Sequence, residues 1–97
     1  MDLTGKQKKY LRGLAHSLKP VVHVGKDGLS AAVRGELSQA LDHHELIKVR
    51  LAGDRHERKE LAGEIENDLE CAVAGSVGAV AILYRPHTDP EQRQIHL

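Results

Sequence analysis

Aromatic side chains are almost absent from this chain of 97 residues. It contains no Phe and no Trp, and its only two aromatics are Tyr10 and Tyr84. Domains that stack unpaired bases on aromatic platforms, such as RRM and OB-fold domains, need several exposed rings. The composition therefore argues against a surface of that kind.

Cysteine is equally scarce, since Cys71 is the only one. A single cysteine cannot form an internal disulfide, which fits a reducing compartment. Its neighbours Ala72, Val73 and Ala74 are apolar, and no histidine stands at a fixed spacing to activate the thiol. We therefore expect a buried structural thiol rather than a nucleophile.

Long hydrophobic runs are also missing. No apolar stretch approaches the roughly 20 residues that cross a bilayer. The N-terminal residues lack the apolar core of a signal peptide. The sequence predicts a cytoplasmic protein that makes no contact with a membrane.

An excess of charge of either sign is lacking too, because 14 Lys and Arg balance 14 Asp and Glu. The balance hides an asymmetry. Residues 1–50 hold nine basic and five acidic side chains, whereas residues 51–97 hold five and nine. The first half is therefore the candidate surface for a polyanion, and the second half is acidic.

The chain is long enough for one domain, and 40% of its residues are hydrophobic. A domain of this size buries roughly two thirds of its unfolded surface and folds without disulfides or metals. We expect a single domain over residues 1–86. Residues 87–97 are polar and contain Pro90, so we expect a loosely ordered C-terminal tail.

Capping signals and hydrophobic periodicity predict seven elements. Thr4 and Gln7 form a capping-box pattern before a helix over 5–17, whose buried stripe would be Leu11, Leu14 and Leu18. A strand over 21–24 precedes a turn, and Ser30 caps a helix that reaches about residue 43. The alternating run 46–51 predicts a strand, and a helix over 54–69 follows. Strands over 71–74 and 79–84 would form a hairpin through 75–78.

The predicted element order is α-β-α-β-α-β-β, which belongs to the α/β class. Strands separated by helices imply parallel pairing, and the closing hairpin adds an antiparallel strand. We expect a four-stranded mixed sheet packed with three helices.

The loop of Gly25, Lys26, Asp27 and Gly28 lies between a predicted strand and a predicted helix. Its glycines would let another backbone approach closely, the helix N-terminus favours anions, and Lys26 could reach a phosphate. GxxG loops of KH modules clamp a nucleic-acid backbone in this way. The alternative is a tight connection that needs glycine only for its turn. A P-loop requires a glycine five residues before Gly25 and a serine or threonine after Lys26. Position 20 is proline and Asp27 follows the lysine, so this motif is excluded.

Basic side chains gather on two further elements. Lys8, Arg12 and His16 recur every four residues on the first helix, with Lys9 beside them. Lys48 and Arg50 share one face of the 46–51 strand. Each group alone is typical of a solvated face. Together with Lys26 they would form a surface that follows phosphates.

The sequence gives little support for a metal site or for catalysis. His43 and His44 are adjacent, so on a helix they point about 100° apart and cannot chelate one ion together. Neither Cys-x-x-Cys nor His-x-x-x-His spacing occurs. We expect no metal, no cofactor and no enzymatic activity. The acidic face of the third helix offers an alternative function, an adaptor that docks proteins; it comprises Glu57, Glu60, Glu64, Glu66, Asp68 and Glu70.

Motifs over roughly residues 2–86 resemble those of the YhbY family of CRM domains (chloroplast RNA splicing and ribosome maturation). The residues that carry the resemblance are Leu3, Thr4, Lys6, Lys8, Leu11, Leu14 to His16, Leu18, Pro20 to Val22, Val24 to Ser30, His43 to Val49 and Leu83 to Pro86.

The resemblance implies an RNA-binding domain of four strands and three helices. It also implies a ribosome-assembly factor whose partner is ribosomal RNA or a precursor of the large subunit, and we expect a monomer. The family's GxxG loop falls on Gly25 and Gly28, with Lys26 and Asp27 between them. Its basic surface falls on Lys8, Lys9, Arg12, Lys48 and Arg85.

Overall fold

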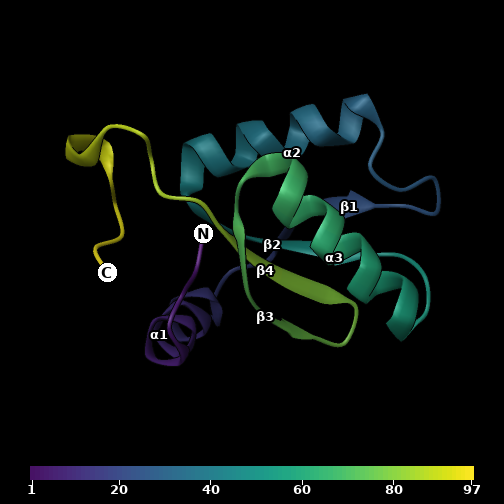
Figure 1. Ribbon diagram of the computed structural model, residues 1–97, viewed down its shortest axis with the longest axis horizontal. Coiled ribbons are helices and arrows are strands. Elements are labelled where there is room, and N and C mark those ends of the chain that lie inside the picture. Colours follow the sequence, from purple (N-terminus) through teal and green to yellow (C-terminus); the bar gives the residue numbers. More distant parts are fainter.

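The computed structural model describes residues 1–97 and has the predicted order of elements (Figure 1). The helices are α1 (Gly5–Ala15), α2 (Ala31–His44) and α3 (Arg55–Leu69), and the strands are β1 (Pro20–Val24), β2 (Leu46–Leu51), β3 (Ala72–Val77) and β4 (Val80–Tyr84). A short 3₁₀ turn, Pro90–Gln92, follows in the C-terminal segment.

The four strands form one mixed sheet in the order β1-β2-β4-β3. β1 and β2 are parallel, while β4 runs antiparallel to both of its neighbours, β2 and β3. The hairpin thus places β4 between the two strands that α3 connects. The predicted four-stranded mixed sheet with three helices is confirmed.

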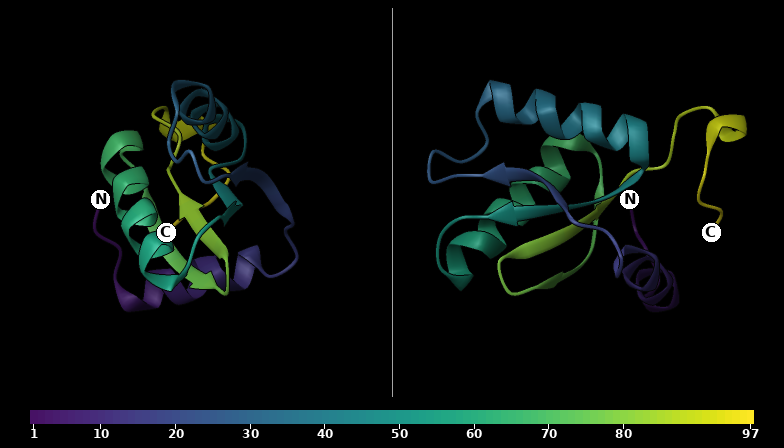
Figure 2. Two further views of the ribbon diagram at one scale, coloured as in Figure 1. Left: turned by 90° about the vertical axis from the view of Figure 1, so that its right-hand side faces the viewer. Right: turned by 180° about the vertical axis from the view of Figure 1, so that it is seen from behind.

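The helices cover the sheet on both sides (Figure 2). Helices α2 and α3 bury Leu37, Leu41 and Ile65 against one face of the sheet, together with Val49 and Leu83. Helix α1 packs on the opposite face. Its buried residues lie in a smaller cluster formed by Leu11, Ala15, Leu46, Ala74, Ile82 and Tyr84. Because side chains alternate along a strand, both faces of β2 and β4 are buried where a helix covers them.

The predicted helix starts are confirmed by their caps. The Thr4 hydroxyl accepts the Gln7 N–H at 3.1 Å, and the Gln7 side chain accepts the Thr4 N–H at 3.0 Å. Asp54 and Glu57 form the same reciprocal pair at α3. At α2 the Ser30 hydroxyl accepts a single N–H. These bonds satisfy donors that the first turn of a helix leaves free.

The predicted buried stripe of α1 was partly wrong. Leu11 is fully buried, but Leu14 and Leu18 are 40% and 38% exposed, and Ala15 is buried in their place. The helix itself ends at Ala15. The buried flank of α1 therefore runs through Leu11 and Ala15, which are one helical turn apart.

The predicted bounds of the final hairpin were also wrong. Strand β3 continues to Val77, and the turn is formed by Gly78, whose φ of +57° suits glycine. Gly75 lies inside β3, where the register with β4 shifts. None of the three helices is long and apolar enough to cross a membrane.

The C-terminal segment makes contacts that its sequence does not predict. It returns toward the end of α2, where Glu45 is only 2% exposed. The Glu45 carboxylate accepts backbone N–H groups from His87 at 2.7 Å, Gln94 at 2.6 Å and Ile95 at 3.0 Å. The loose order expected for residues 87–97 stays a prediction about their motion in solution.

Candidate nucleic-acid interface

The loop between β1 and α2 is a tight turn. The Gly28 N–H donates to the Gly25 carbonyl at 3.0 Å, and Gly28 has a φ of +72°. Only glycine adopts this region at little cost, which explains the second glycine of the loop. Lys26 and Asp27 occupy the exposed tip. The loop lies at the end of the molecule opposite α1 and the C-terminal segment (Figure 1).

The start of α2 directly follows this loop. Its first turn contains no acidic residue, and Ser30 supplies the cap. The partial positive charge of the helix start is therefore not neutralised by its own first turn, an arrangement that favours anions. Residues 25–30 thus combine an exposed turn, a lysine and a helix N-terminus.

Basic side chains lie on the face of the sheet that α1 covers only in part. Arg50 of β2 is exposed and lies beside His23 of β1 in the strand register. Lys48 shares that face, and its Nζ donates to the His16 carbonyl at the end of α1 at 3.5 Å. The cations of β2 therefore lie between α1 and the Gly25–Gly28 loop. We call the surface of Lys48 and Arg50 the basic face.

Arg12 of α1 makes a specific contact within the protein. Its Nη1 donates to the Ala74 carbonyl of β3 at 3.1 Å, and its aliphatic chain covers Gly75. Since Lys8 precedes Arg12 by one helical turn, it shares this flank of α1. Lys9 is exposed nearby. Arg12 therefore joins α1 to the sheet and contributes fewer free donors than its exposure suggests.

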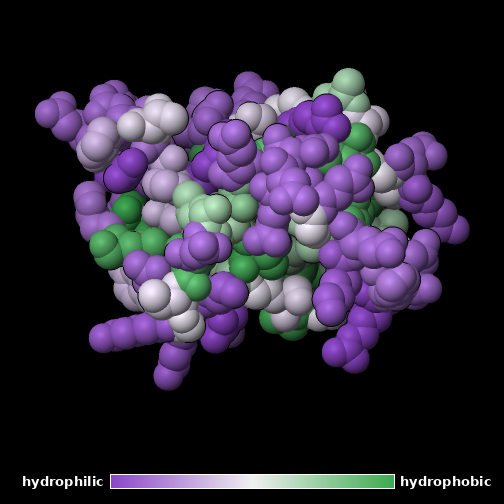
Figure 3. Space-filling model, viewed as in Figure 1, coloured by the Kyte–Doolittle hydropathy of each residue, from purple (hydrophilic) through white to green (hydrophobic).

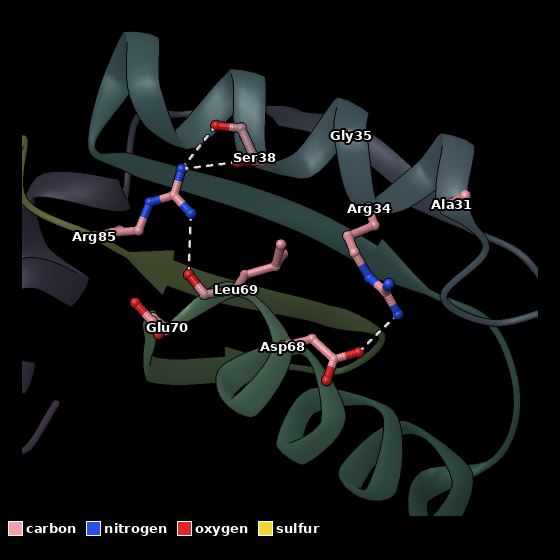
Figure 4. A pocket seen from close by; sticks show the side chains of 8 residues that line it. All are labelled: Ala31, Arg34, Gly35, Ser38, Asp68, Leu69, Glu70 and Arg85. Carbon is pink, nitrogen blue, oxygen red and sulfur yellow. Dashed lines mark hydrogen bonds and ion pairs between the residues drawn. The ribbon is translucent and has the colours of Figure 1, made fainter.

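Arg85 lies on the opposite side of the sheet, between α2 and α3 (Figure 4). Its guanidinium donates to the carbonyls of Leu69 and Ser38, to the Ser38 hydroxyl and to Asp42 at 2.9 Å. These bonds tie the end of α3 to α2. The structure does not bring Arg85 together with the basic face.

An acidic groove borders the other side of the Gly25–Gly28 loop. It has a volume of about 410 Å³ and is lined by Gly25, Lys26, Gly28, Ala52, Gly53, Glu57, Glu60, Leu61 and Glu64. The sequence does not reveal this neighbourhood, because β2 and its connection separate the loop from α3. A polyanion can therefore approach the loop favourably only from the side of the basic face.

The single cysteine of the chain lies in the interior. Burial, followed by the charge of Glu66, raises the pKa of the Cys71 thiol to about 11. The thiol is 3% exposed, which confirms the predicted buried cysteine. No group of three or more His, Cys, Asp or Glu side chains is placed to hold a metal ion.

Three helices around a mixed four-stranded sheet, with a glycine-bounded turn leading into α2, define a small α/β domain. Residues 3–85 match the family model of the CRS1/YhbY (CRM) domain. The chain belongs to the CRM-domain family, as its motifs predicted.

Relatives from distant bacteria share most of this chain. It is 45% identical over 85 residues to an "RNA-binding protein" of Haemophilus influenzae, covering 87% of this chain and 86% of the relative. It is 34% identical over 96 residues to "Probable RNA-binding protein YqeI" of Bacillus subtilis, covering 98% of both. The solution structure of SAV1595 from Staphylococcus aureus matches with a TM-score of 0.83 and 30% identity, covering 98% of this chain and 100% of that one.

Proposed function

We propose that this protein binds RNA through the basic face and the Gly25–Gly28 loop, and that it acts in the cytoplasm as an assembly factor on precursor RNA of the large ribosomal subunit. It works by binding and not by catalysis. Two observations support the proposal: Lys48 and Arg50 lie on one face of β2, and Arg50 lies beside His23 of β1, the strand that leads into the loop. The RNA-binding names of its relatives support it.

The loop would contribute close approach and charge. The exposed turn allows a phosphate to reach the backbone and the N-terminus of α2, where partial positive charge is available. Lys26 would neutralise one phosphate. Asp27 shares the tip, so the loop has no net charge of its own. Its role is therefore to position the RNA backbone, and β2 supplies the excess of positive charge.

The other predicted site residues fall into two groups, those with exposed side chains and those bonded within the protein. Lys8 and Lys9 would extend the surface along α1. Arg12 and Arg85 would act indirectly. Arg12 joins α1 to β3, and Arg85 joins α2 to the end of α3. Substitution of either arginine should therefore lower stability before it lowers RNA affinity.

The test compares two double variants of equal charge change. Lys48→Gln/Arg50→Gln removes two cations from the basic face. Arg55→Gln/Lys59→Gln removes two exposed cations from α3, on the opposite side of the sheet. Affinity for a fragment of large-subunit ribosomal RNA is measured over a range of salt concentrations.

The basic-face variant should bind more weakly, and its slope of log affinity against log salt should shrink by about 1 to 1.5. The α3 variant should bind like the original protein. Equal binding by all three proteins would exclude the basic face. The ribosomal role is tested separately, by sedimentation of the protein with large-subunit precursors and with mature subunits.

A second function, docking of a basic protein segment on α3, is favoured by the acidic groove beside the loop. Glu60 and Glu64 are exposed there, whereas Glu57 is occupied by the helix cap. A partner retained after nuclease treatment, and lost on Glu60→Lys/Glu64→Lys, would establish this function. Loss of the partner on nuclease treatment alone would show that RNA connects the two.

A further inference from the structure

An apolar groove opens at the end of the molecule away from the loop. Its volume is about 490 Å³, which lies within the range of small-molecule sites. Six of its nine lining residues are hydrophobic. The lining residues are Leu14, Leu18, Lys19, Val21, His44, Leu46, Ile47, Gln94 and Ile95.

The groove is lined by the ends of α1 and α2, by the starts of β1 and β2, and by the C-terminal segment. Figure 2 shows α1, the end of α2 and the C-terminal segment at the same end of the molecule. Leu14 lies in the last turn of α1, Leu18 follows the end of that helix, and both line the groove together with Val21 of β1. Val21 is 51% exposed. Contiguous exposed apolar side chains of this kind are typical of ligand-binding grooves.

The C-terminal segment forms the opposite wall. Ile95 also packs against the smaller core cluster under α1. The positions of Gln94 and Ile95 are fixed by Glu45, which accepts both of their backbone N–H groups. Figure 3 shows the molecule in the same orientation as Figure 1. Hydrophobic surface lies between this segment and α1, while the surface over α2 and α3 is mostly hydrophilic.

The charged and polar residues around the groove indicate the kind of ligand that fits it. No acidic residue lines it, whereas Lys19 and His44 do. Lys48 of the basic face lies beside the end of α1, which also supplies a groove wall. A ligand with an apolar, flat part and a neighbouring negative charge suits this combination. The Gln94 amide and the His44 ring could each donate and accept hydrogen bonds at the edge of that flat part.

We propose that the groove receives an unpaired nucleobase of the bound RNA, whose backbone passes over the end of α1 to the basic face. The inference rests on the proposed RNA binding and narrows it to RNA with a single-stranded segment. It also explains how a protein with so few aromatics can hold a base, because insertion between aliphatic walls replaces stacking on rings.

The test measures affinity for a short single-stranded RNA and for a fully paired duplex of the same length. Leu14→Gln/Leu18→Gln makes the groove polar and alters residues that are partly exposed. Of the two, only Leu14 lies in α1, where glutamine has a helix propensity similar to that of leucine. Val77→Gln is the control, since Val77 is a 73% exposed hydrophobic residue outside the groove. Unfolding midpoints verify that each variant is folded.

The groove variant should lose about tenfold in affinity for the single strand, which equals about 1.4 kcal/mol. Its affinity for the duplex should not change, and the Val77 variant should match the original protein with both RNAs. An unchanged single-strand affinity, or an equal loss with both RNAs, would overturn the groove as a base site. If the groove variant dissociates an oligomer seen by sedimentation without RNA, the groove belongs to self-association instead.

A second measurement needs no substitution. A single-stranded RNA that carries one photoreactive 4-thiouridine is crosslinked to the unaltered protein, and the attached peptide is identified. Crosslinks at residues 14–21 or 94–97 support the proposal, and crosslinks confined to the loop and β2 overturn it while leaving the proposed function intact. Failure of the unaltered protein to bind either RNA would overturn both.

Discussion

Glu45 and Gln94 are joined across 49 positions of the chain, since the Glu45 Oε1 accepts the Gln94 backbone N–H at 2.6 Å. The same carboxylate also accepts the N–H groups of His87 and Ile95. One buried side chain at the end of α2 therefore anchors the C-terminal segment at three backbone positions, two of which belong to a wall of the apolar groove.

Replacement of this carboxylate should detach the segment. Glu45→Gln places an amide NH₂ opposite backbone donors, so at least one buried hydrogen bond is lost, at a cost of about 1–3 kcal/mol. Urea unfolding measures this loss, and amide hydrogen exchange should accelerate at Gln94 and Ile95. Glu70→Gln is the control, because Glu70 ends α3 with a similar positive φ but is exposed. Unchanged exchange in Glu45→Gln would show that other contacts hold the segment.

The same carboxylate makes stability depend on pH. Burial alone would raise the pKa of Glu45, but the backbone N–H groups of His87, Gln94 and Ile95 and the charge of His87 outweigh burial and lower that pKa. A lowered pKa in the folded state adds stability above the unfolded value of about 4.3 and loses it as pH falls through the folded pKa. The stability difference between the original protein and Glu45→Gln should therefore shrink on acidification. A constant difference between neutral and acidic pH would contradict this linkage.

Gly28 and Gly25 should differ in their tolerance of alanine. Gly28 has a φ of +72°, so Gly28→Ala should cost about 1–2 kcal/mol of stability. A Cβ at Gly25 would meet open space and its φ is not positive, so Gly25→Ala should leave stability unchanged or raise it by up to about 1 kcal/mol. Thermal or urea unfolding distinguishes the two. Any loss of RNA affinity in Gly25→Ala would then report directly on close backbone approach.

Arg12 and Gly75 should be energetically coupled. A Cβ at Gly75 would lie 2.6 Å from the Arg12 Cδ, so Gly75→Ala must displace the arginine and its bond to Ala74. We expect a loss of about 1–3 kcal/mol in Gly75→Ala. In an Arg12→Ala background the loss should be smaller by at least about 0.5 kcal/mol, as a double-mutant cycle on unfolding would measure. Strict additivity would mean that the two residues do not contact in solution.

Cys71 should react only when the protein unfolds. Its thiol is buried and its pKa is raised to about 11, mainly by burial, so little thiolate exists at neutral pH. Modification by a disulfide reagent should be slow in buffer and immediate in urea. Cys71→Ala/Ser76→Cys, which moves the thiol to an exposed position of β3, should react at once in buffer. Fast reaction of the original protein in buffer would reveal local opening around α3 and β3.

Local signals predicted the helices and strands well, because their causes are local. The capping pairs at Thr4 and Asp54 are only three residues long, and β2 shows its alternation directly in sequence. Hydrophobic spacing could not decide which flank of α1 meets the sheet. The structure buries Leu11 and Ala15, a choice that depends on the sheet against which α1 packs.

The candidate site was harder to predict where its partners are distant in sequence. The family resemblance assigned Arg85 to the basic surface, yet its acceptors lie on α2 and at the end of α3, 16 to 47 positions away. The sequence did not indicate that Glu45 would be buried and bonded, because its three backbone donors lie 42 to 50 positions further along. Pairing of polar groups across a fold follows from topology and not from residue type.

Helices α1 and α3 pack on opposite faces of the sheet, so the basic side chains of α1 are separated from the glutamates of α3. The two helices lie roughly 20 Å apart across the intervening strands, whereas physiological salt screens charges beyond about 8 Å. Phosphates that meet the cations of β2 are therefore shielded from the glutamates of α3. A chain with no net charge can therefore still present a locally positive surface at β2 to a polyanion.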